Sequence, residues 1–571
     1  MRRRHKSKPR KIRKFVIPAV AALIIIAVII IIHDRRTIFE IAPPPKAPDW
    51  NSGPIVHLLP TVNHNRILMK VSFEKPFAEP PRLKIGDDYF VGQQTDTKGY
   101  FWAFDATGLK PKTTYELVIQ DSAGNNLCDA WPLSTFPSPE DRPEHFRLLI
   151  YTCAGGHDAH ITWRGTGPIP LAARTRLLKK ALSLQPDAVI SSGDQIYYDL
   201  VYGRTPKYMG RSPESVAYAG TFDRSIPVLG TKNEEVLKKA VGPQIANLYG
   251  TLFHSIPTFF MLDDHDYFEN DEARPEDTFN WVDLLIGWRN PIIKAGVSFP
   301  PDDFMLDLGR SSQKLYLPEF LPDATWPADL PAVGAPDRAP GVSECYGTLR
   351  YGTLVEILLF ECRRFITLAG PHSVLVHPAA ERWLINRMQA EETTHIMNAS
   401  ATIFGWSAGK WMEWYPDIRE EDKLTTARPK YMWQEGWFTQ HNRLLKAASS
   451  MKKTIPLFVC GDIHDISAGR ILRSGELDLS ANPVIAIASG SLGTGPRGFP
   501  SGAVRKMVAQ PPTDLTVEEW LAPVEKDGFM IADFMPDKIV IQFYAWRPPE
   551  PLEAIDTLEP FHSLELKIPP Q

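Results

Sequence analysis

The sequence predicts a mixed α/β protein that follows a short all-β domain and an N-terminal membrane anchor. Three patterns carry this prediction: an apolar run at 15–32, short alternating segments at 50–138, and apolar strands that alternate with amphipathic helices from 144 onward. The chain has 571 residues, of which 43% are hydrophobic and 23% are charged. This length and composition are typical of a globular protein with more than one domain.

The N-terminal segment combines a basic stretch with an apolar run. Nine of the first fourteen residues are Arg or Lys, and eighteen uncharged residues follow. Such a run is about the minimum for a membrane-spanning helix, and the basic flank places the amino terminus in the cytoplasm. A cleaved signal peptide is the alternative, but the run is long for one and no small-residue cleavage site follows. We expect a cytoplasmic tail at 1–14 that orients the protein and does not bind nucleic acid, a single-pass anchor at 15–33, and an extracytoplasmic remainder.

A Pro-rich spacer at 34–49 leads into a segment with the pattern of a β-sandwich. Within 50–138, stretches such as "RILMKVSF" and "TYELVIQD" alternate apolar and polar residues, and turn signals such as "DSAGNN" separate them. The piece "GLKPKTTYELVI" resembles the fibronectin type III pattern of immunoglobulin-like sandwiches, with Tyr115 placed as a tyrosine corner. No group of catalytic side chains gathers here, so we expect the sandwich to serve packing or spacing.

The region 144–571 contains four apolar strands that end in metal-competent side chains. These strands are "FRLLIYTCA", "DAVISSGD", "TFFMLDDHD" and "IPLFVCGDIHD", and amphipathic helices such as "AARTRLLKKALSL" lie between strands of this region. The side chains at and after their ends are Cys153, then Asp194, Tyr197 and Asp199, then Asp263, Asp264, His265 and Asp266, then Asp462 and His464. Ligands of α/β sheets bind beyond the carboxyl ends of the strands, so the four segments are expected to meet at one crevice. A single Gly-Asp turn is common, and the inference therefore needs all four.

The mixture of side chains predicts two unlike cations. Thiolate, imidazole and phenolate suit a softer or redox-active transition metal, whereas carboxylates suit Ca²⁺, Mg²⁺ or Mn²⁺. Asp194 stands where a carboxylate could bridge the two. Two cations roughly 4 Å apart can stabilise the attacking and leaving oxygens of an in-line phosphoryl displacement and lower the pKa of a bound water.

The motifs "GDQIYYD", "DDHDYFEND" and "GDIHD", in this order, closely resemble those of the alkaline phosphatase D (PhoD-like) family of the calcineurin-like phosphoesterase superfamily. The resemblance covers the sandwich and the region from about 145 to the end. It implies a four-layer αββα metallophosphatase domain, hydrolysis of phosphate esters, and a binuclear centre of Fe³⁺ and Ca²⁺.

The resemblance also implies individual roles. Cys153 would ligate the iron as thiolate, Tyr197 as phenolate, and His464 would complete the iron set. Asp194 would bridge the metals. Asp264 stands where the superfamily has the metal-binding Asn of its Asn-His-Glu/Asp motif.

Two further histidine positions of the superfamily map onto this sequence. Asp462 replaces the first His of a Gly-His-x-His motif, which suits Ca²⁺. His265 stands at the catalytic His, which binds the phosphoryl oxygen and protonates the leaving group.

The sequence departs from the family pattern after the middle strand, where "FECRR" replaces the usual Leu-Asp-Thr-Arg. If the Glu361 carboxylate holds Arg363, this arginine keeps its role in shaping the site and binding substrate.

Several of these residues also have structural explanations that do not involve the metals. Cys153 could be a buried structural thiol, and either Tyr197 or the adjacent Tyr198 could only pack. Asp263 and Asp266 could cap a helix or orient ligands. Asn270 and Asp271 could hold a further cation.

The main hypothesis is a membrane-anchored, extracytoplasmic phosphatase or phosphodiesterase. A metal-bound hydroxide would attack phosphorus in line, with Asp194 and His265 as catalytic residues. A phosphate ester would be its substrate, and monoesters and diesters both stay open. The alternative is a catalytically inert surface binding or assembly protein on the same scaffold. The complete set of metal-competent residues argues against it, because an inert domain has no reason to keep them all.

Overall fold

The structure is a computed structural model. It describes residues 42–156, 168–198, 218–267, 301–321, 323–327, 343–409, 413–420, 423–427, 433–493 and 507–568. The expected tail and anchor at 1–33 lie outside these ranges, as do Asp199, Asn270 and Asp271. Among the described residues, no helix combines the length and the apolar composition that crossing a membrane requires.

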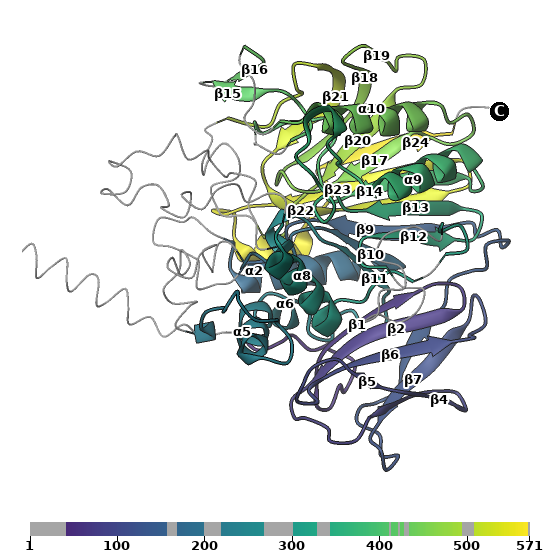
Figure 1. Ribbon diagram of the computed structural model, residues 1–571. Coiled ribbons are helices and arrows are strands. Elements are labelled where there is room, and N and C mark those ends of the chain that lie inside the picture. The colour runs from purple at the N-terminus through teal and green to yellow at the C-terminus, as the bar shows by residue number, and fades with distance from the viewer. Residues whose placement is uncertain are drawn as a thin grey trace, which may run out of the picture. The chain divides into compact units, whose positions relative to one another are not determined.

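Two four-stranded sheets form the amino-terminal β-sandwich (Figure 1). The first has the order β1 (Ile55–Val62), β2 (Arg66–Phe73), β6 (Phe101–Thr107) and β5 (Gln93–Gln94), and the second β4 (Asp88–Val91), β3 (Arg82–Ile85), β7 (Thr114–Gln120) and β8 (Trp131–Ser134). All pairings within the two sheets are antiparallel. The hydroxyl oxygen of Tyr115 accepts a hydrogen bond from the backbone N–H of Lys110 at 2.7 Å, which confirms the expected tyrosine corner.

Two larger sheets form the rest of the fold. One has the order β11 (Thr258–Met261), β10 (Ala188–Ser192), β9 (Phe146–Tyr151), β22 (Asp527–Met535), β23 (Lys538–Trp546) and β24 (His562–Lys567). The other has the order β12 (Tyr346–Tyr351), β13 (Val355–Phe360), β14 (His395–Ser400), β17 (Leu457–Cys460), β20 (Val484–Ser489), β18 (Ile466–Ser474) and β19 (Leu477–Asp478), with β21 (Leu515–Val524) paired to β18. A short hairpin joins β15 (Ile418–Glu420) and β16 (Lys423–Thr425).

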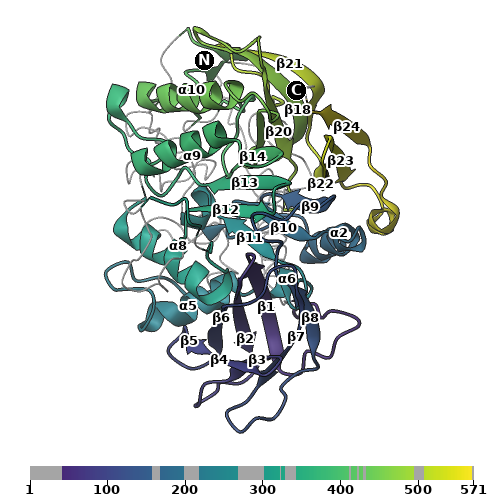
Figure 2. The ribbon, with the colours of Figure 1, turned by 90° about the vertical axis from the view of Figure 1, so that its right-hand side faces the viewer.

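The two larger sheets bury one common core between them and carry helices on their outer faces. Leu148 and Ile190 from one sheet share a cluster with Leu359 and Val459 from the other. Figure 2 shows α9 (Pro378–Ala390) and α10 (Glu435–Ser449) on one side of the paired sheets and α2 (Leu171–Ser183) on the other. The parallel strands β9, β10, β13, β14 and β17 are buried nearly throughout, because helices or the second sheet cover both of their faces. The predicted mixed α/β fold is therefore confirmed.

Further helices share a buried cluster with Leu149, Val189 and Phe260 of the six-stranded sheet. They are α5 (Lys232–Val241), α6 (Ala246–Tyr249), α8 (Asp303–Tyr316) and the 3₁₀ helix η2 (Asp264–Tyr267). The 3₁₀ helix η7 (Leu552–Thr557) contacts α2, and η5 (Gly370–His372) contacts α10. The side chain of Asp302 caps α8 by accepting the backbone N–H of Met305.

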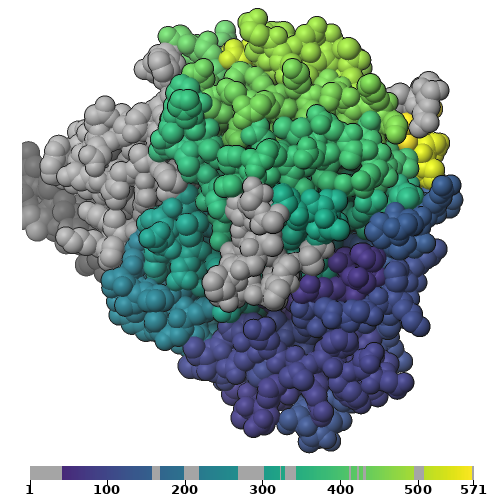
Figure 3. Space-filling view, turned by 45° about the vertical axis from the view of Figure 1, so that its right-hand side comes forward, coloured from purple at the N-terminus to yellow at the C-terminus, as the bar shows by residue number. Residues whose placement is uncertain are grey.

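The sandwich joins this part of the fold through α8 and the residues that follow it. Lys70 of β2 is 3% exposed, and its ammonium donates to the carboxylate of Glu319 at 3.0 Å and to the carbonyl of Lys314 at 3.2 Å. The ring of Phe101 packs edge-on against that of Tyr316, with centroids 4.9 Å apart. In Figure 3 the purple surface of the sandwich runs into the blue and teal surface of the residues that follow.

Candidate metal centre

Four strand ends bring the predicted residues to one edge of the paired sheets. Cys153, Asp194, Asp263 and Asp462 each stand two residues beyond the end of β9, β10, β11 and β17, respectively. Because β10 pairs in parallel with both β9 and β11, the first three ends lie side by side. The fourth arrives from the other sheet.

Thr152 and Gly461 hold the two sheets together at this edge. The hydroxyl of Thr152 donates to the carbonyl of Ser192 at 2.7 Å and accepts from the backbone N–H of Asp462 at 3.5 Å. A Cβ atom at Gly461 would lie 2.3 Å from the Ser192 carbonyl oxygen and 2.4 Å from the Thr152 hydroxyl. Glycine is therefore needed for the strand ends to approach.

The first group of metal-competent atoms contains sulfur, nitrogen and oxygen. The Sγ of Cys153, a carboxylate oxygen of Asp194 and a ring nitrogen of His464 all lie within 4.8 Å of one another. The Tyr197 hydroxyl lies 3.2 Å from Asp194 Oδ2 and 3.1 Å from His464 Nε2. The structure thus gathers all four residues that the sequence assigned to the first cation.

Two further groups share members with the first. Asp194, Asp264 and His265 offer atoms within 4.8 Å of one another, and so do Asp263, Asp264 and Asp462. Asp194 belongs to two groups, as a bridging carboxylate would. The ring of His265 lies against that of Tyr197, with centroids 4.2 Å apart. His265 therefore stands among the metal-competent side chains, and Asp263, which the sequence left as a cap or orienting residue, stands there too.

Left-handed backbone conformations concentrate at this site. Seven non-glycine residues of the described chain have positive φ, and four of them are Cys153 (48°), Asp194 (57°), Asp462 (78°) and His464 (55°). This conformation is uncommon for residues other than glycine and persists where the surroundings determine it. The fold therefore holds four of the predicted ligands in conformations that their own chain segments do not favour.

Asp266 fixes the loop that carries Asp194. Its carboxylate accepts backbone N–H groups from Asp194 at 2.8 Å, Ile196 at 2.8 Å and Asp263 at 2.9 Å. The side-chain oxygen of Gln244 accepts the backbone N–H of Tyr197 at 2.9 Å. The sequence left Asp266 open between two roles, and nothing in the sequence around Gln244 pointed to the site.

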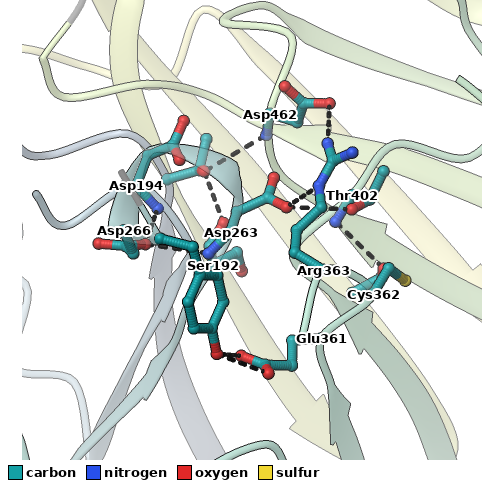
Figure 4. Close-up of polar contacts among 12 residues, drawn as sticks. Ser192, Asp194, Asp263, Asp266, Glu361, Cys362, Arg363, Thr402 and Asp462 are labelled. Atoms are coloured by element: carbon teal, nitrogen blue, oxygen red, sulfur yellow. Dashed lines mark hydrogen bonds and ion pairs between the residues drawn. The ribbon is translucent and has the colours of Figure 1, made fainter. Parts of the chain in front are cut away.

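Arg363 is fully buried between two carboxylates (Figure 4). Its Nε donates to Asp263 Oδ1 at 2.5 Å, and its Nη2 donates to Asp462 Oδ2 at 3.4 Å. The sequence interpretation allowed Glu361 to hold this arginine. The structure differs, because Arg363 donates to Asp263 and Asp462, whereas Glu361 accepts from the Tyr267 hydroxyl, at 2.8 and 3.0 Å.

The chemistry of these residues fits a pair of cations. Burial raises the pKa of the Cys153 thiol and of the Tyr197 phenol well above their ordinary values, and the neighbouring Asp194 carboxylate adds to both rises. Desolvation raises the pKa of Asp194 as well. A bound cation favours the deprotonated form of each of these ligands. Asp194 Oδ1 is buried and accepts no hydrogen bond from the described residues, so it can serve as a ligand atom.

Comparisons with known proteins identify the fold. No family model matches the chain, and no curated protein matches it. Among solved structures, PhoD aligns with a TM-score of 0.55 at 14% identity, over 92% of each chain. A purple acid phosphatase from seeds of yellow lupin (Lupinus luteus) aligns with a TM-score of 0.49 at 12% identity, over 90% of this chain and 75% of that one. The chain therefore has a fold similar to that of PhoD.

Proposed function

We propose that this chain is a metal-dependent phosphoesterase with a binuclear centre. One observation carries the proposal: four strand ends from two sheets bring a thiol, a phenol, two imidazoles and a group of carboxylates to one point. A structural role does not account for so many buried ionisable groups at one edge, because burying each of them costs free energy. The fold shared with PhoD supports this proposal.

The side chains divide between two cation positions. Cys153, Tyr197 and His464 hold the first, Asp264 and Asp462 hold the second, and Asp194 lies between them. Sulfur, phenolate and imidazole suit a softer or redox-active transition metal at the first position, and oxygen ligands suit Ca²⁺, Mg²⁺ or Mn²⁺ at the second. Within these classes we propose Fe³⁺ and Ca²⁺, the pair that the resemblance to the PhoD-like family implies. Such a pair of cations supplies positive charge for a phosphoryl group in transfer and acidifies a water molecule.

His265 acts on the substrate in this proposal, and Arg363 orients one of the metal ligands. His265 donates a hydrogen bond to the phosphoryl oxygen and a proton to the leaving oxygen. Arg363 keeps Asp462 oriented through the Nη2 contact, with Asp263 holding the other side of the guanidinium. We therefore assign Arg363 to orienting a ligand carboxylate in place of the substrate binding that the resemblance implied, and its complete burial supports this change.

We also propose that the anchor at 15–33 places this centre outside the cytoplasm. The uncharged run that starts at Phe15 and its basic flank support this location. Cell fractionation of the full-length chain, followed by protease treatment of intact cells, tests it. Recovery of the chain in the soluble fraction would overturn the anchor.

Metal analysis and hydrolysis assays on the full chain test the function. We expect two metal ions per chain and turnover of para-nitrophenyl phosphate, bis(para-nitrophenyl) phosphate or both. His265→Ala should lower turnover by about a hundred- to ten-thousand-fold while both metals remain. Asp88→Asn, which removes an exposed carboxylate on β4, is the control.

Three outcomes would change the conclusion. A chain without metal and without turnover would be a binding or assembly protein on a phosphatase-like scaffold. Loss of one metal from His265→Ala would place this histidine among the ligands, as its group with Asp194 and Asp264 allows. A loss of activity in Asp88→Asn would show that the assay reports folding and not the centre.

A further inference from the structure

Tyr267 anchors the short helix that carries two residues of the centre. It is the last residue of η2, in which Asp264 and His265 are the first two. Its side chain is completely buried, and its hydroxyl is shared between the two carboxylate oxygens of Glu361, at 2.8 and 3.0 Å. Glu361 directly follows β13 of the eight-stranded sheet, whereas η2 follows β11 of the six-stranded sheet. This contact therefore ties the helix to the opposite sheet.

Helix α8 closes the other side of the Tyr267 ring. A Cβ atom at Gly309 of α8 would lie 2.8 Å from two carbons of the ring and 3.3 Å from the carbonyl oxygen of Asp266. Only glycine lets the helix backbone pack this closely. The ring is thus enclosed by α8, and its hydroxyl is held by Glu361.

The helix needs such an anchor. A single turn of 3₁₀ helix has little stability of its own, because few hydrogen bonds offset the entropy of ordering it. Asp266 fixes the neighbouring loops through its carboxylate, but the backbone groups that it binds belong to Asp194, Ile196 and Asp263. The hydrogen bond from the Tyr267 hydroxyl to Glu361, together with the packing of α8 on the ring, therefore holds the carboxyl end of η2.

We propose that Glu361 is a positioning residue of the centre, which acts through the Tyr267 hydroxyl to hold Asp264 and His265 in register with Asp194. The proposal rests on the proposed phosphoesterase function. It assigns a role to the buried carboxylate that stands where the PhoD-like family has a shorter one. The environment of Glu361 is consistent with a fixed acceptor, since Cys345 and Arg364 lie near it and Arg364 pairs with Glu344.

Three single variants and one double variant test the proposal. Tyr267→Phe removes the donor, Glu361→Leu removes the acceptor, and Glu361→Gln keeps an oxygen that can accept the hydroxyl. Tyr316→Phe deletes another buried tyrosine hydroxyl, which lies in α8 and donates to the carbonyl of Lys238, and serves as the matched control.

The measurements are Mn²⁺ affinity of the metal-free chain by calorimetry, and kcat and KM for para-nitrophenyl phosphate. We expect Tyr267→Phe and Glu361→Leu each to lower Mn²⁺ affinity or kcat by about 10- to 100-fold, with a smaller change in KM. The double variant Tyr267→Phe/Glu361→Leu should lose no more Mn²⁺ affinity or kcat than the more impaired of the two single variants, because both substitutions remove the same hydrogen bond. Glu361→Gln should recover most of the loss, and Tyr316→Phe should resemble the unaltered chain.

Different results test the Glu361–Tyr267 contact and the phosphoesterase activity. Additive losses in the double variant would overturn the proposal, and so would the absence of recovery in Glu361→Gln. If Glu361→Leu unfolds the chain, the comparison of Tyr267→Phe with Glu361→Gln still decides, since both keep the volume of the side chain. A chain that binds Mn²⁺ but turns over neither ester would refute the phosphoesterase, while the Mn²⁺ affinities would still test the contact.

Discussion

Replacement of Asp266 by asparagine tests whether its carboxylate fixes the Asp194 loop. Oδ2 of Asp266 accepts the N–H groups of Asp194 and Asp263, and Oδ1 accepts that of Ile196. Asparagine has one oxygen that accepts and an amide group that only donates. If its oxygen takes the place of Oδ2, the amide group faces the N–H of Ile196, and one of the three hydrogen bonds is lost.

The expected cost follows from these contacts. A buried N–H without an acceptor costs about 1–3 kcal/mol, and each of the two remaining bonds loses about 1 kcal/mol because its acceptor is no longer charged. Removal of a buried carboxylate offsets part of this, since desolvation raises the pKa of Asp266 well above its ordinary value. We expect the free energy of unfolding to fall by about 2–4 kcal/mol. Because Asp194 shifts with its loop, Mn²⁺ affinity should fall by about 10- to 100-fold.

Urea unfolding of the metal-free chain and Mn²⁺ calorimetry measure the two effects. Asp121→Asn is the control: it makes the same chemical change in an exposed turn, where Asp121 accepts the backbone N–H of Asn125 at 2.8 Å. The control should stay within about 0.5 kcal/mol of the unaltered chain. If Asp266→Asn is as stable as this control and binds Mn²⁺ equally well, the carboxylate does not hold the loop.

Three further predictions concern the metals and the pH dependence of stability. Tyr197→Phe should lower the iron content of the purified chain, whereas Tyr198→Phe should not; equal iron in both would exclude a phenolate ligand. Chelation should abolish turnover, and added Mn²⁺ should restore it; turnover that survives metal removal would refute the binuclear centre. Burial lowers the pKa of His57 to about 3, so its stabilising neutral form is fully present above the unfolded value of about 6.5 and is lost as the pH falls. Between a pH well above 6.5 and pH 4.5 the free energy of unfolding should fall by about 2.7 kcal/mol. His57→Phe should remove this part of the acid sensitivity of urea unfolding, and His372→Phe, at an exposed position, should leave it unchanged.

The sequence could predict which segments meet at the site, because the position of strand ends in a parallel sheet follows a general rule. Cys153, Asp194, Asp264 and Asp462 follow apolar strands, and parallel strands expose their carboxyl ends at one edge. The structure places these residues together, and the tyrosine corner at Tyr115 was equally visible, because its motif is local.

The remaining features depend on backbone conformation and on distant partners. No pattern in the sequence marks the left-handed conformation of His464, whose φ is 55°. The partners of Arg363 lie 100 and 99 residues away in sequence. The sequence interpretation paired Glu361 with Arg363 because only one residue separates them. In the fold, Glu361 accepts from Tyr267, whereas Arg363 donates to Asp263 and Asp462.

The interface that contains the ion pair between Lys70 and Glu319 has a consequence for the segment 137–143, which connects β8 of the sandwich to β9 of the six-stranded sheet. Beside this ion pair, apolar side chains of the sandwich such as Leu58 and Phe136 share one buried cluster with Phe146 and Phe259 of the six-stranded sheet, and separation would expose them to water. A chain cut by a protease at this connection should therefore stay assembled as two fragments under native conditions. The covalent link would then matter for bringing the two pieces together during synthesis and not for keeping them together afterwards.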